Sequence, residues 1–462
     1  MVRVFNVYYP VRTIVLLLGE TLIICASFLL AGLAWQGNDF VLRMRYGGEF
    51  LNIALASGVC LVCLYYHDLY DSLLLSNPRE TFTRLVQVLG SACVILAILY
   101  YILPVVRLEF GLFVLGMVLA GVLLSFWRRL FFAVNASERL ARRGIVVGAD
   151  ALAASLQVEI ERRPEYGVRL IGYVGTPTEP GSMNGLPCLG SVESLPALVE
   201  RERVSQLIIS MRERRGKLPM ESLLQLKTQG VMVEDGSNVY ESFTGKVPLD
   251  SLRLSWLLFG RGFRVSAVML IYKRAASLIV SGLGLLVASP LMALIAVAIR
   301  LDSKGPALFL QDRVGRAGKT FQLYKFRSMR DGADPDGQFK PAEADDPRFT
   351  RVGRWLRRLR LDEIPQLYNI LRGDMHFVGP RPFVPNQEEE YAAKIPFYRQ
   401  RWSVTPGATG WAQINREYCA TIDDNVEKLS YDLYYIKNMS VGLDLLIAFR
   451  TIKILLLGRG GR

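Results

Sequence analysis

Long apolar runs recur four times in the N-terminal part of the chain, separated by short polar stretches. They are Thr13–Trp35, Phe50–Tyr66, Leu85–Leu103 and Phe110–Phe126. Each is close to the roughly 20 residues that an α-helix needs to cross a bilayer. The pattern predicts a four-helix transmembrane domain over residues 1–135, in preference to a soluble protein with four buried helices. The first run is too long for a cleavable signal peptide and lacks a small-residue cleavage site.

Basic residues near the ends of these runs predict the orientation of the domain. They lie before the first run, between the second and third, and after the fourth, at Arg3, Arg12, Arg79, Arg84, Arg128, Arg129, Arg139, Arg142 and Arg143. Because cytoplasmic loops are enriched in Lys and Arg, both ends of the domain are predicted to be cytoplasmic, although Arg43 and Arg45 in the first loop oppose this. Glu20 lies within the first run, where a carboxylate is costly and indicates a functional or inter-helix contact.

After Arg143 the pattern changes to short strand-like runs that alternate with helical stretches. GIVVGA, RLIGYV, QLIIS and VMVED read as strands, and Leu218–Gln229 as one of the helices between them. This rhythm predicts a Rossmann-like βαβ module with a doubly wound sheet over residues 143–250. The turn after the first strand holds a single glycine, Gly148, so the GxGxxG fingerprint is absent. A regulatory or dimerising module is therefore favoured over dinucleotide binding.

Ala275–Ile299 is a fifth uncharged and mostly apolar run. Ser289–Pro290 interrupts it, and basic residues flank both of its ends, at Lys273, Arg274, Arg300 and Lys304. At about 1.5 Å per residue, neither arm reaches across a bilayer core of about 30 Å, and flanking bases favour the cytoplasm at both ends. We therefore predict a re-entrant membrane helix over residues 273–300. Its bend lies at Ser289–Pro290, where the Ser289 hydroxyl or packed protein satisfies the freed carbonyl.

The overall charge narrows the range of partners. The 462 residues include 55 Lys and Arg against 42 Asp and Glu, a formal net charge of +13. Such an excess suits inner-membrane lipid or a phosphorylated ligand, and no nucleic-acid-binding module is recognisable. Six scattered cysteines and two histidines predict neither a zinc site nor a disulfide framework.

Two adjacent acids, Asp362 and Glu363, lie among cations in the segment LDEIPQLYNILRGDMHFVGPRP. The arginines around them are Arg351, Arg354, Arg357, Arg358, Arg360, Arg372 and Arg381. The apolar residues at helical spacing after the acids are Ile364, Leu367, Tyr368 and Leu371, and Gly373 suits the end of that helix. The acids are then predicted at a helix N-terminus, which favours a carboxylate or a bound phosphate. The alternative is a helix cap on a solvated basic surface.

A basic hairpin is predicted before this segment. PALFLQ and TFQLYKF alternate as two strands joined by a glycine-containing loop, and their basic residues are Arg313, Lys319, Lys325 and Arg327. Such a hairpin could grip a diphosphate, or it could be a solvated surface.

Five motifs follow one another in the C-terminal half. They are KFRSM (325–329), LDEIPQLYNILRGDM (361–375), VGPRP (378–382), PGATGWAQIN (406–415) and YDLYYIKN (431–438). Together they resemble the bacterial sugar transferase family of monotopic polyprenyl-phosphate phosphoglycosyl transferases. The spans and the βαβ module before them are similar to the large subgroup that initiates exopolysaccharide or O-antigen synthesis. The resemblance implies a monotopic α+β catalytic domain over residues 265–462.

The resemblance implies transfer of a sugar 1-phosphate from a UDP-sugar to undecaprenyl phosphate, with release of UMP. It implies a bacterial inner-membrane protein whose catalytic domain is cytoplasmic. Asp362 would be the nucleophile of a covalent aspartyl-phosphosugar intermediate, and Glu363 together with Asp362 would hold Mg²⁺. Lys325, Arg327 and Arg381 would be phosphate ligands. The residue chemistry agrees, because a carboxylate among arginines is ionised without a separate base and Mg²⁺ prefers oxygen ligands.

Further substrate-binding candidates are Arg313, Arg372 and Asp432, with helix capping and packing as the structural alternative for Asp432. The chain also departs from the family pattern at four positions. Ser277 stands where Asp commonly follows the Lys-Arg pair, His376 where Ser is frequent, Ala408 where Ile is usual and Cys419 where Gly is common.

Two other functions compete with the transferase. Nucleotide-sugar dehydratases and epimerases also join membrane spans to a βαβ module, although their glycine fingerprint is missing here. A non-enzymatic polysaccharide-assembly scaffold would need the acids only as helix caps. The sequence leaves the sugar open, with glucose, galactose and N-acetylhexosamines as candidates. A homodimer through the spans or the βαβ module is compatible with it.

Overall fold

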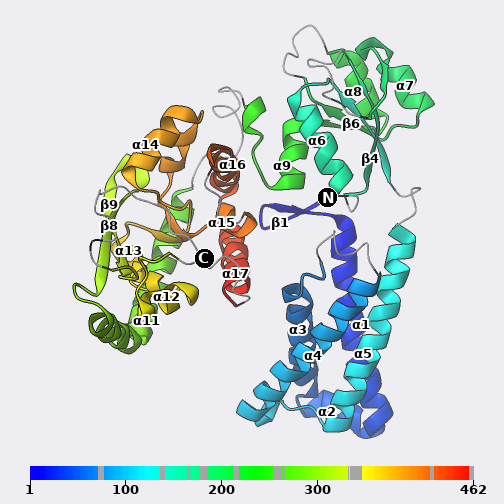
Figure 1. The fold of residues 1–462 in the computed structure, drawn as a ribbon. Helices are drawn as coiled ribbons and strands as arrows, with labels where there is room; N and C mark the ends of the chain where they lie inside the picture. The colour runs from blue at the N-terminus through cyan, green and yellow to red at the C-terminus, as the bar shows by residue number, and fades with distance from the viewer. Residues whose placement is uncertain are drawn as a thin grey trace. The chain divides into compact units, whose positions relative to one another are not determined.

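The computed structural model describes residues 1–70, 78–135, 141–163, 166–175, 183, 185–211, 218–252, 263, 266–330, 332, 346–416 and 421–456. Contacts divide the chain into two units, each of which is described by itself. The first contains Met1–Val2 and Tyr8–Val239, and the second contains Arg3–Val7 and Tyr240–Arg462 (Figure 1). Residues 240–250, placed by sequence with the βαβ module, thus belong to the second unit. Cys419 lies outside the described residues.

Long helices form over all four apolar runs of the first unit. They are α1 (Val11–Gln36), α3 (Glu49–Tyr66), α4 (Pro78–Ile102) and α5 (Phe110–Asn135). Their shared core includes Phe28, Leu64, Leu96 and Leu112, all fully buried. In the described chain five helices are long and apolar enough to cross a membrane, these four and α11 (Ala267–Asp302) of the second unit.

Glu20 makes an inter-helix contact, one of the two roles predicted for it. Its carboxylate on α1 lies 2.6 Å from the Arg128 guanidinium on α5, and both side chains are buried. The Tyr70 hydroxyl donates to Glu20 at 2.6 Å, and Arg128 also donates to the Leu69 carbonyl at 3.1 Å. A buried carboxylate among apolar helices requires such a partner.

One of the two arginines that opposed the predicted orientation, Arg43, is paired within the unit. Arg43 lies on the short helix α2 (Asn38–Tyr46) and is 3.2 Å from Glu109, which precedes α5. Trp35 and Gln36, at the end of α1, donate to the same carboxylate at 2.9 and 2.7 Å. The α1–α3 and α4–α5 connections therefore meet at one end of these four helices.

The βαβ module is a five-stranded parallel sheet with the strand order β5-β4-β3-β6-β7. Its strands are β3 (Arg142–Val147), β4 (Val168–Val174), β5 (Cys188–Gly190), β6 (Gln206–Ile209) and β7 (Met232–Asp235). Side chains alternate along a strand, and β3 accordingly supplies two cores. Ile145 and Val147 pack with α7 (Leu195–Arg201) and α8 (Met220–Thr228), whereas Val146 packs with α6 (Ala151–Arg162). Helices thus cover both faces, which confirms the predicted α/β class.

The turn after the first strand of this sheet contains Asp150, whose side chain caps the next helix. Asp150 caps α6 and accepts hydrogen bonds from the Ala153 amide at 3.0 Å and from the Ser210 hydroxyl at 2.6 Å. Gly148 has φ 103°, and a Cβ there would lie 2.0 Å from the Ser210 carbonyl oxygen. In dinucleotide-binding folds this helix N-terminus receives the pyrophosphate. Here the Asp150 carboxylate accepts from the first turn of that helix.

The second unit combines α11 with short strands and helices. The strands are β8 (Leu308–Val314) and β9 (Thr320–Phe326), an antiparallel hairpin, and β10 (His376–Val378) and β11 (Gly407–Thr409), a parallel pair. The helices are α12 (Arg351–Arg358), α13 (Gln366–Arg372), α14 (Pro385–Lys394), α15 (Trp411–Asn415), α16 (Ile422–Asn438) and α17 (Val441–Leu456). The predicted hairpin is confirmed.

Helix α11 continues through Pro290 without a break. Proline cannot donate to the Leu286 carbonyl, and the Ser289 hydroxyl donates to that carbonyl instead, at 2.8 Å. The predicted repair of the freed carbonyl is therefore present. Near the break Leu286 and Val287 are 71% and 78% exposed.

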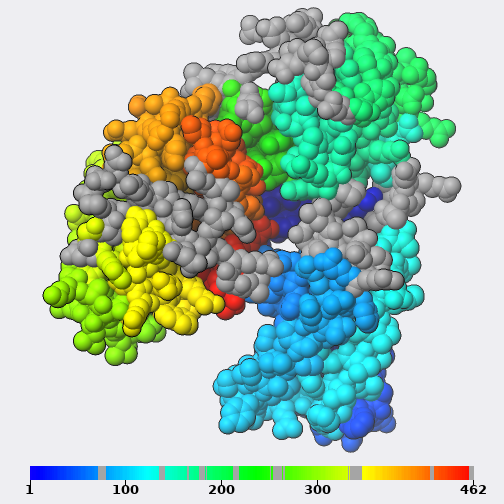
Figure 2. All heavy atoms as spheres, in the orientation of Figure 1, coloured from blue at the N-terminus to red at the C-terminus, as the bar shows by residue number. Residues whose placement is uncertain are grey.

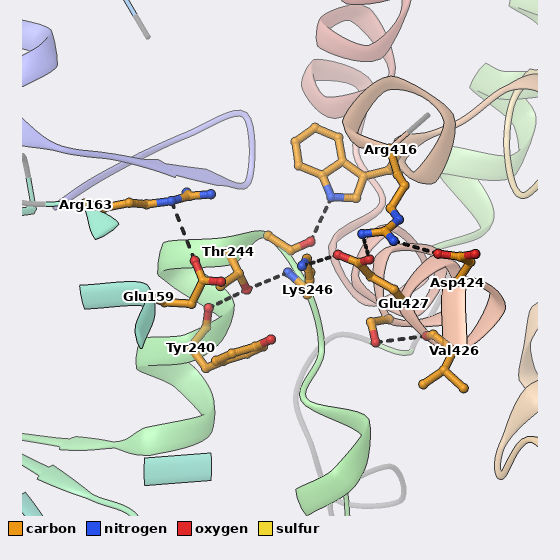
Figure 3. A network of polar contacts seen from close by, with 12 residues as sticks. Glu159, Arg163, Tyr240, Thr244, Lys246, Arg416, Asp424, Val426 and Glu427 are labelled. Carbon is orange, nitrogen blue, oxygen red and sulfur yellow. Dashed lines mark hydrogen bonds and ion pairs between the residues drawn. The ribbon is translucent and has the colours of Figure 1, made fainter. Parts of the chain in front are cut away.

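Helix α16 is held against the start of the second unit by a polar network (Figure 3). Lys246 lies 2.5 Å from Glu427 on α16, and Arg416 pairs with both Glu427 and Asp424, in the latter case at 2.7 Å. The Trp411 indole donates to the Gly245 carbonyl at 2.8 Å. These contacts fix α16, which carries Asp432.

Candidate active site

The two acids lie in a 3₁₀ turn, η7 (Leu361–Glu363), between α12 and α13. The acids thus lie in a helical first turn, as predicted, but this turn is 3₁₀ and the α-helix itself, α13, begins only at Gln366. Pro365 has no N–H to bond back to Leu361, and the Ile364 amide makes the tighter three-residue bond to the Leu361 carbonyl at 3.2 Å. Gly373 ends the helix with φ 99°, as predicted.

The buried face of α13 also differs from the predicted apolar face. Tyr368 is 46% exposed, whereas Asn369 and Ile370 are almost completely buried. The reason is polar: Asn369 accepts a hydrogen bond from the Tyr324 amide at 3.0 Å and donates to the Gln322 carbonyl at 2.6 Å. These bonds join α13 to β9. Sequence reasoning missed Asn369, whose only signal is an amide inside an apolar helical run.

Glu363 collects the cations of the site. Its carboxylate lies 3.3 Å from Lys325 on β9, 3.0 Å from Arg381 and 3.8 Å from Arg360. Burial alone would raise the pKa of Glu363, but the charges of Lys325, Arg381 and Arg360 outweigh it and hold that pKa well below its usual range. Glu363 is therefore ionised at neutral pH and positions the two phosphate-binding candidates Lys325 and Arg381.

Asp362 has the opposite environment. It is 8% exposed and makes no hydrogen bond or ion pair with any described residue. Burial raises the pKa of Asp362; Lys325, Arg357 and Arg360 lower it less strongly, and the neighbouring Glu363 adds to the rise. The sequence predicts a carboxylate held ionised by arginines, whereas the structure assigns the paired cations to Glu363 and leaves the oxygens of Asp362 uncommitted.

The loop that carries Arg381 is positioned by two buried arginines. Arg401 donates to the Arg381 carbonyl at 2.9 Å, and Arg313 donates to the Pro382 carbonyl at 3.1 Å. Arg401 in turn pairs with Asp432 at 2.8 Å and Glu388 at 3.1 Å. The structure therefore places Arg313 and Asp432 behind the loop, where they support Arg381.

Two other predicted ligands lie apart from the acidic pair. The Arg327 guanidinium is buried and donates to the carbonyl and hydroxyl of Ser303, at 2.8 and 2.7 Å, beyond the end of α11. Arg372 is at the C-terminal end of α13, where it lies 3.6 Å from Asp374 and is 60% exposed. The acids precede the opposite end of that helix. The structure thus gathers Asp362, Glu363, Lys325 and Arg381 but leaves out Arg327 and Arg372.

Two of the departures from the family pattern touch each other. The Ser277 hydroxyl on α11 is 3.0 Å from Nδ1 of His376 on β10, and both side chains are buried. Burial, and then the charge of Lys273, lowers the pKa of His376 to about 4, so the ring is neutral at pH 7. A neutral hydroxyl–imidazole pair therefore fills this contact between α11 and the strands. A third departure, Ala408, packs against the core cluster formed by Leu323, Ile370 and Met375.

Asp362 and Glu363 are the candidate residues for a bound metal ion. Among the described residues, no group of three or more His, Cys, Asp or Glu side chains is placed to hold an ion. Two adjacent carboxylates suffice for Mg²⁺ when substrate phosphate oxygens and waters complete its coordination shell. The uncommitted oxygens of Asp362 beside Glu363 fit that limited role.

Two known sequence families match this chain, one of them over the C-terminal part that contains the acidic pair. The family described as "Bacterial sugar transferase" matches residues 268–458, and the one described as "CoA-binding domain" matches residues 66–228. The chain is 32% identical over 314 residues to an Escherichia coli protein named UDP-glucose:undecaprenyl-phosphate glucose-1-phosphate transferase, and the match covers 67% of each chain. The chain therefore belongs to the bacterial sugar transferase family.

Two further relatives carry similar names. An Aeromonas hydrophila UDP-N-acetylgalactosamine-undecaprenyl-phosphate N-acetylgalactosaminephosphotransferase is 42% identical over 225 residues, which cover 48% of this chain and 52% of the relative. A Komagataeibacter xylinus undecaprenyl-phosphate glucose phosphotransferase is 36% identical over 333 residues, covering 69% and 59%. The chain thus spans between half and three fifths of the length of these two relatives.

Proposed function

We propose that this protein transfers a sugar 1-phosphate from a UDP-sugar to undecaprenyl phosphate, as an initiating step of bacterial polysaccharide synthesis at the inner membrane. The observation that carries the proposal is that the two adjacent acids have different environments. Glu363 holds the cations, and Asp362 keeps a buried carboxylate without a described partner. The family match and the names of the relatives supply the reaction class.

The proposed reaction has two displacements at one phosphorus. An Asp362 oxygen attacks the phosphorus that bears the sugar, the bond to the UMP oxygen breaks, and UMP leaves with the electron pair. A phosphate oxygen of undecaprenyl phosphate then attacks the same phosphorus, and the bond to Asp362 breaks to restore the carboxylate. A covalent intermediate divides one difficult transfer into two easier ones.

The surrounding residues have roles in charge and position. Lys325 and Arg381, oriented by Glu363, would contact the diphosphate oxygens, where cations stabilise the developing charge. Glu363 and Asp362 are the residues that would hold Mg²⁺, and that ion would supply further charge neutralisation when bound. Burial keeps water away from the Asp362 carboxylate, which favours its attack on phosphorus.

We place α11 in the cytoplasmic leaflet as a re-entrant helix. Contacts with the same unit near both of its ends support this placement. Arg274 donates to the Ile370 carbonyl at the end of α13, at 3.0 Å. Asp302 accepts from the Val352 amide of α12 at 2.9 Å, near the other end. A spanning helix would carry one of these contacts to the far side of the bilayer.

The decisive experiment is Asp362→Asn in the full chain. We expect no UMP release from UDP-glucose or UDP-N-acetylgalactosamine in the presence of undecaprenyl phosphate, and no protein-bound phosphosugar by mass spectrometry. The matched control is Asp312→Asn, an exposed acid on β8, which should retain both signals. Turnover by Asp362→Asn would refute the proposal. The scaffold alternative predicts no UMP release from the unmodified protein either.

A second experiment tests the topology. A single reactive cysteine in place of Lys304, just after α11, should be labelled by membrane-impermeant maleimide only from the cytoplasmic side. Labelling from the periplasmic side would refute the re-entrant placement of α11 and leave the catalytic proposal to its own test.

A further inference from the structure

Strand β8 begins with three apolar residues in a row, Leu308, Phe309 and Leu310, which we call the β8 run. They are 40%, 45% and 48% exposed, respectively. Because side chains alternate along a strand, the β8 run is apolar and exposed on both faces of the hairpin. Figure 2 shows the yellow-green part of the chain, which contains the end of α11 and the hairpin, at the surface of the molecule.

The β8 run lies on an open edge of the sheet. The hairpin has two strands, so β8 has β9 on one side only. At the far end of β8 the Val314 amide donates to the Phe383 carbonyl at 3.0 Å, whereas no backbone of the described residues outside the hairpin bonds to the β8 run. Consecutive exposed apolar residues on a sheet edge are an aggregation hazard unless they have a function. The β8 run therefore requires an apolar partner.

Phe309 places the β8 run beside the two phosphate-binding candidates. In the hairpin register Phe309 is directly opposite Lys325. Opposite residues of an antiparallel pair point to the same face, with Cβ atoms about 5 Å apart. The Lys325 ammonium lies 3.3 Å from the Glu363 carboxylate, and Arg381 lies 3.0 Å from the same carboxylate. A ligand whose phosphate contacts these two cations therefore has its next atoms within reach of the Phe309 ring.

The other end of the β8 run leads to the apolar helix α11. Ala307, the residue before the run, packs in one cluster with Ile295 and Ile299 of α11. At about 3.3 Å per residue, Ala307 lies about 7 Å along the strand from Phe309. The β8 run thus forms a short apolar connection between the cations of the site and α11.

The chemistry of the two substrates decides which molecule needs such a connection. In the proposed second displacement, a polyprenyl phosphate brings its phosphate to the adduct on Asp362 while its isoprenoid chain stays in an apolar environment. The UDP-sugar has no apolar chain. A bulk phospholipid has an apolar chain, but nothing requires its headgroup at Lys325 and Arg381. The polyprenyl acceptor alone combines a phosphate for these cations with a chain for the β8 run.

We propose that the β8 run binds the isoprenoid units next to the phosphate of the polyprenyl acceptor, while that phosphate lies at Lys325 and Arg381. Departure of UMP frees these cations, so the donor and acceptor phosphates use them in turn. The effect of this contact on transfer rests on the proposed function, whereas the binding of polyprenyl phosphate to β8 does not require turnover.

The binding is tested first without turnover. The full chain with Phe309→p-benzoylphenylalanine is placed in phosphatidylcholine nanodiscs that contain a small fraction of undecaprenyl phosphate, without UDP-sugar, and irradiated. The matched control carries the same probe at Leu294, which is 69% exposed on α11. We expect the ratio of polyprenyl to phospholipid adducts, measured by mass spectrometry, to be several times higher at position 309. An equal ratio at both positions, or phospholipid adducts alone at position 309, would overturn the proposal.

The consequence for transfer is tested with Phe309→Ser and Leu310→Ser combined, and with the two displacements measured separately. Formation of the protein-bound phosphosugar from UDP-sugar alone should keep its rate within about twofold. Decay of that adduct on addition of subsaturating undecaprenyl phosphate should slow about tenfold or more, because two apolar side chains lose their contact with the isoprenoid chain. The matched control is Leu294→Ser with Val297→Ser, two exposed residues of α11, and should keep both rates.

Two outcomes of this kinetic test contradict the proposal. The first is an unchanged decay of the adduct in the double variant of the β8 run. The second is an equal slowing of both displacements, which would make the run a structural surface with no preference for the acceptor. Absence of adduct and of UMP release in the unmodified protein would refute the proposed function alone, because the crosslinking result would still decide the polyprenyl site.

Discussion

Mutation of Asp432 can distinguish between two roles for this residue. The sequence predicts a substrate ligand, whereas the structure indicates a support of the loop that carries Arg381. The Asp432 carboxylate lies 2.8 Å from Nε of Arg401, and the two side chains are 3% and 5% exposed. Arg401 keeps a second carboxylate, Glu388, at 3.1 Å when Asp432 is changed. The expected loss is therefore that of one partner in a buried network of three charges.

The size of the effect follows from these contacts. Loss of one partner of a buried ion pair costs about 3–5 kcal/mol, and the remaining Glu388 places Asp432→Ala near the lower end. Asp432→Asn retains the shape and an acceptor oxygen, so it exchanges a charged hydrogen bond for a neutral one, at about 1 kcal/mol. For a unit of this size these losses lower the unfolding midpoint by about 6–12 °C and about 2–4 °C, respectively.

The assay combines thermal unfolding of the full chain in detergent, at a fixed scan rate, with initial rates of UMP release over a range of UDP-sugar concentrations. We expect the midpoint to fall in the order given and the KM for UDP-sugar to stay within about twofold below the transition. Asp423→Asn, an exposed acid on the same helix, is the control and should change neither. A KM raised about tenfold with an unchanged midpoint would refute the reasoning and make Asp432 a substrate ligand.

Two predictions concern pH. Because Asp362 must be ionised to attack, the acid limb of kcat reports its pKa; Lys325 lowers that pKa and Glu363 raises it, so Lys325→Gln should move the limb to higher pH and Glu363→Gln to lower pH. A shift in the same direction for both variants would contradict the charge assignment. His376 has a pKa of about 4 against 6.5 when free, so the unfolded chain binds the extra proton between these values. Stability is then complete above pH 6.5 and falls by up to about 3 kcal/mol towards pH 4. His376→Gln should flatten this slope in unfolding midpoints measured from pH 4.5 to 8, and an unchanged slope would contradict the assignment.

The parts of the fold that depend on local pattern could be predicted from the sequence. The four apolar runs, the alternating strands of the sheet and the repair of Leu286 by Ser289 each involve residues close together in the chain. Apolar run length and side-chain periodicity act over such distances, so the long apolar helices, the βαβ module and the hairpin could be predicted. The pairing of Asp362 with Glu363 could also be predicted, because the two residues are neighbours in the sequence.

The parts that depend on distant partners could not be predicted. Which acid receives the cations is decided by Lys325 and Arg381, which reach Glu363 from separate elements. The inward face of α13 is decided by amide bonds from Asn369 to a strand more than forty residues earlier. Asp432 looked like a ligand because it lies within one of the family's motifs, and only the fold shows that its carboxylate pairs with the buried Arg401. Polar contacts of this kind have no periodic signature.

The bond from Ser289 to the Leu286 carbonyl has one more consequence. The carbonyl freed by a proline in a membrane helix can be satisfied by a neighbouring helix, an ordered water or a Ser or Thr side chain. In α11 the hydroxyl that satisfies this carbonyl comes from Ser289, three residues after Leu286 on the same helix. Helix α11 should therefore keep its helical backbone around Pro290 among acyl chains alone, without a neighbouring helix to complete it.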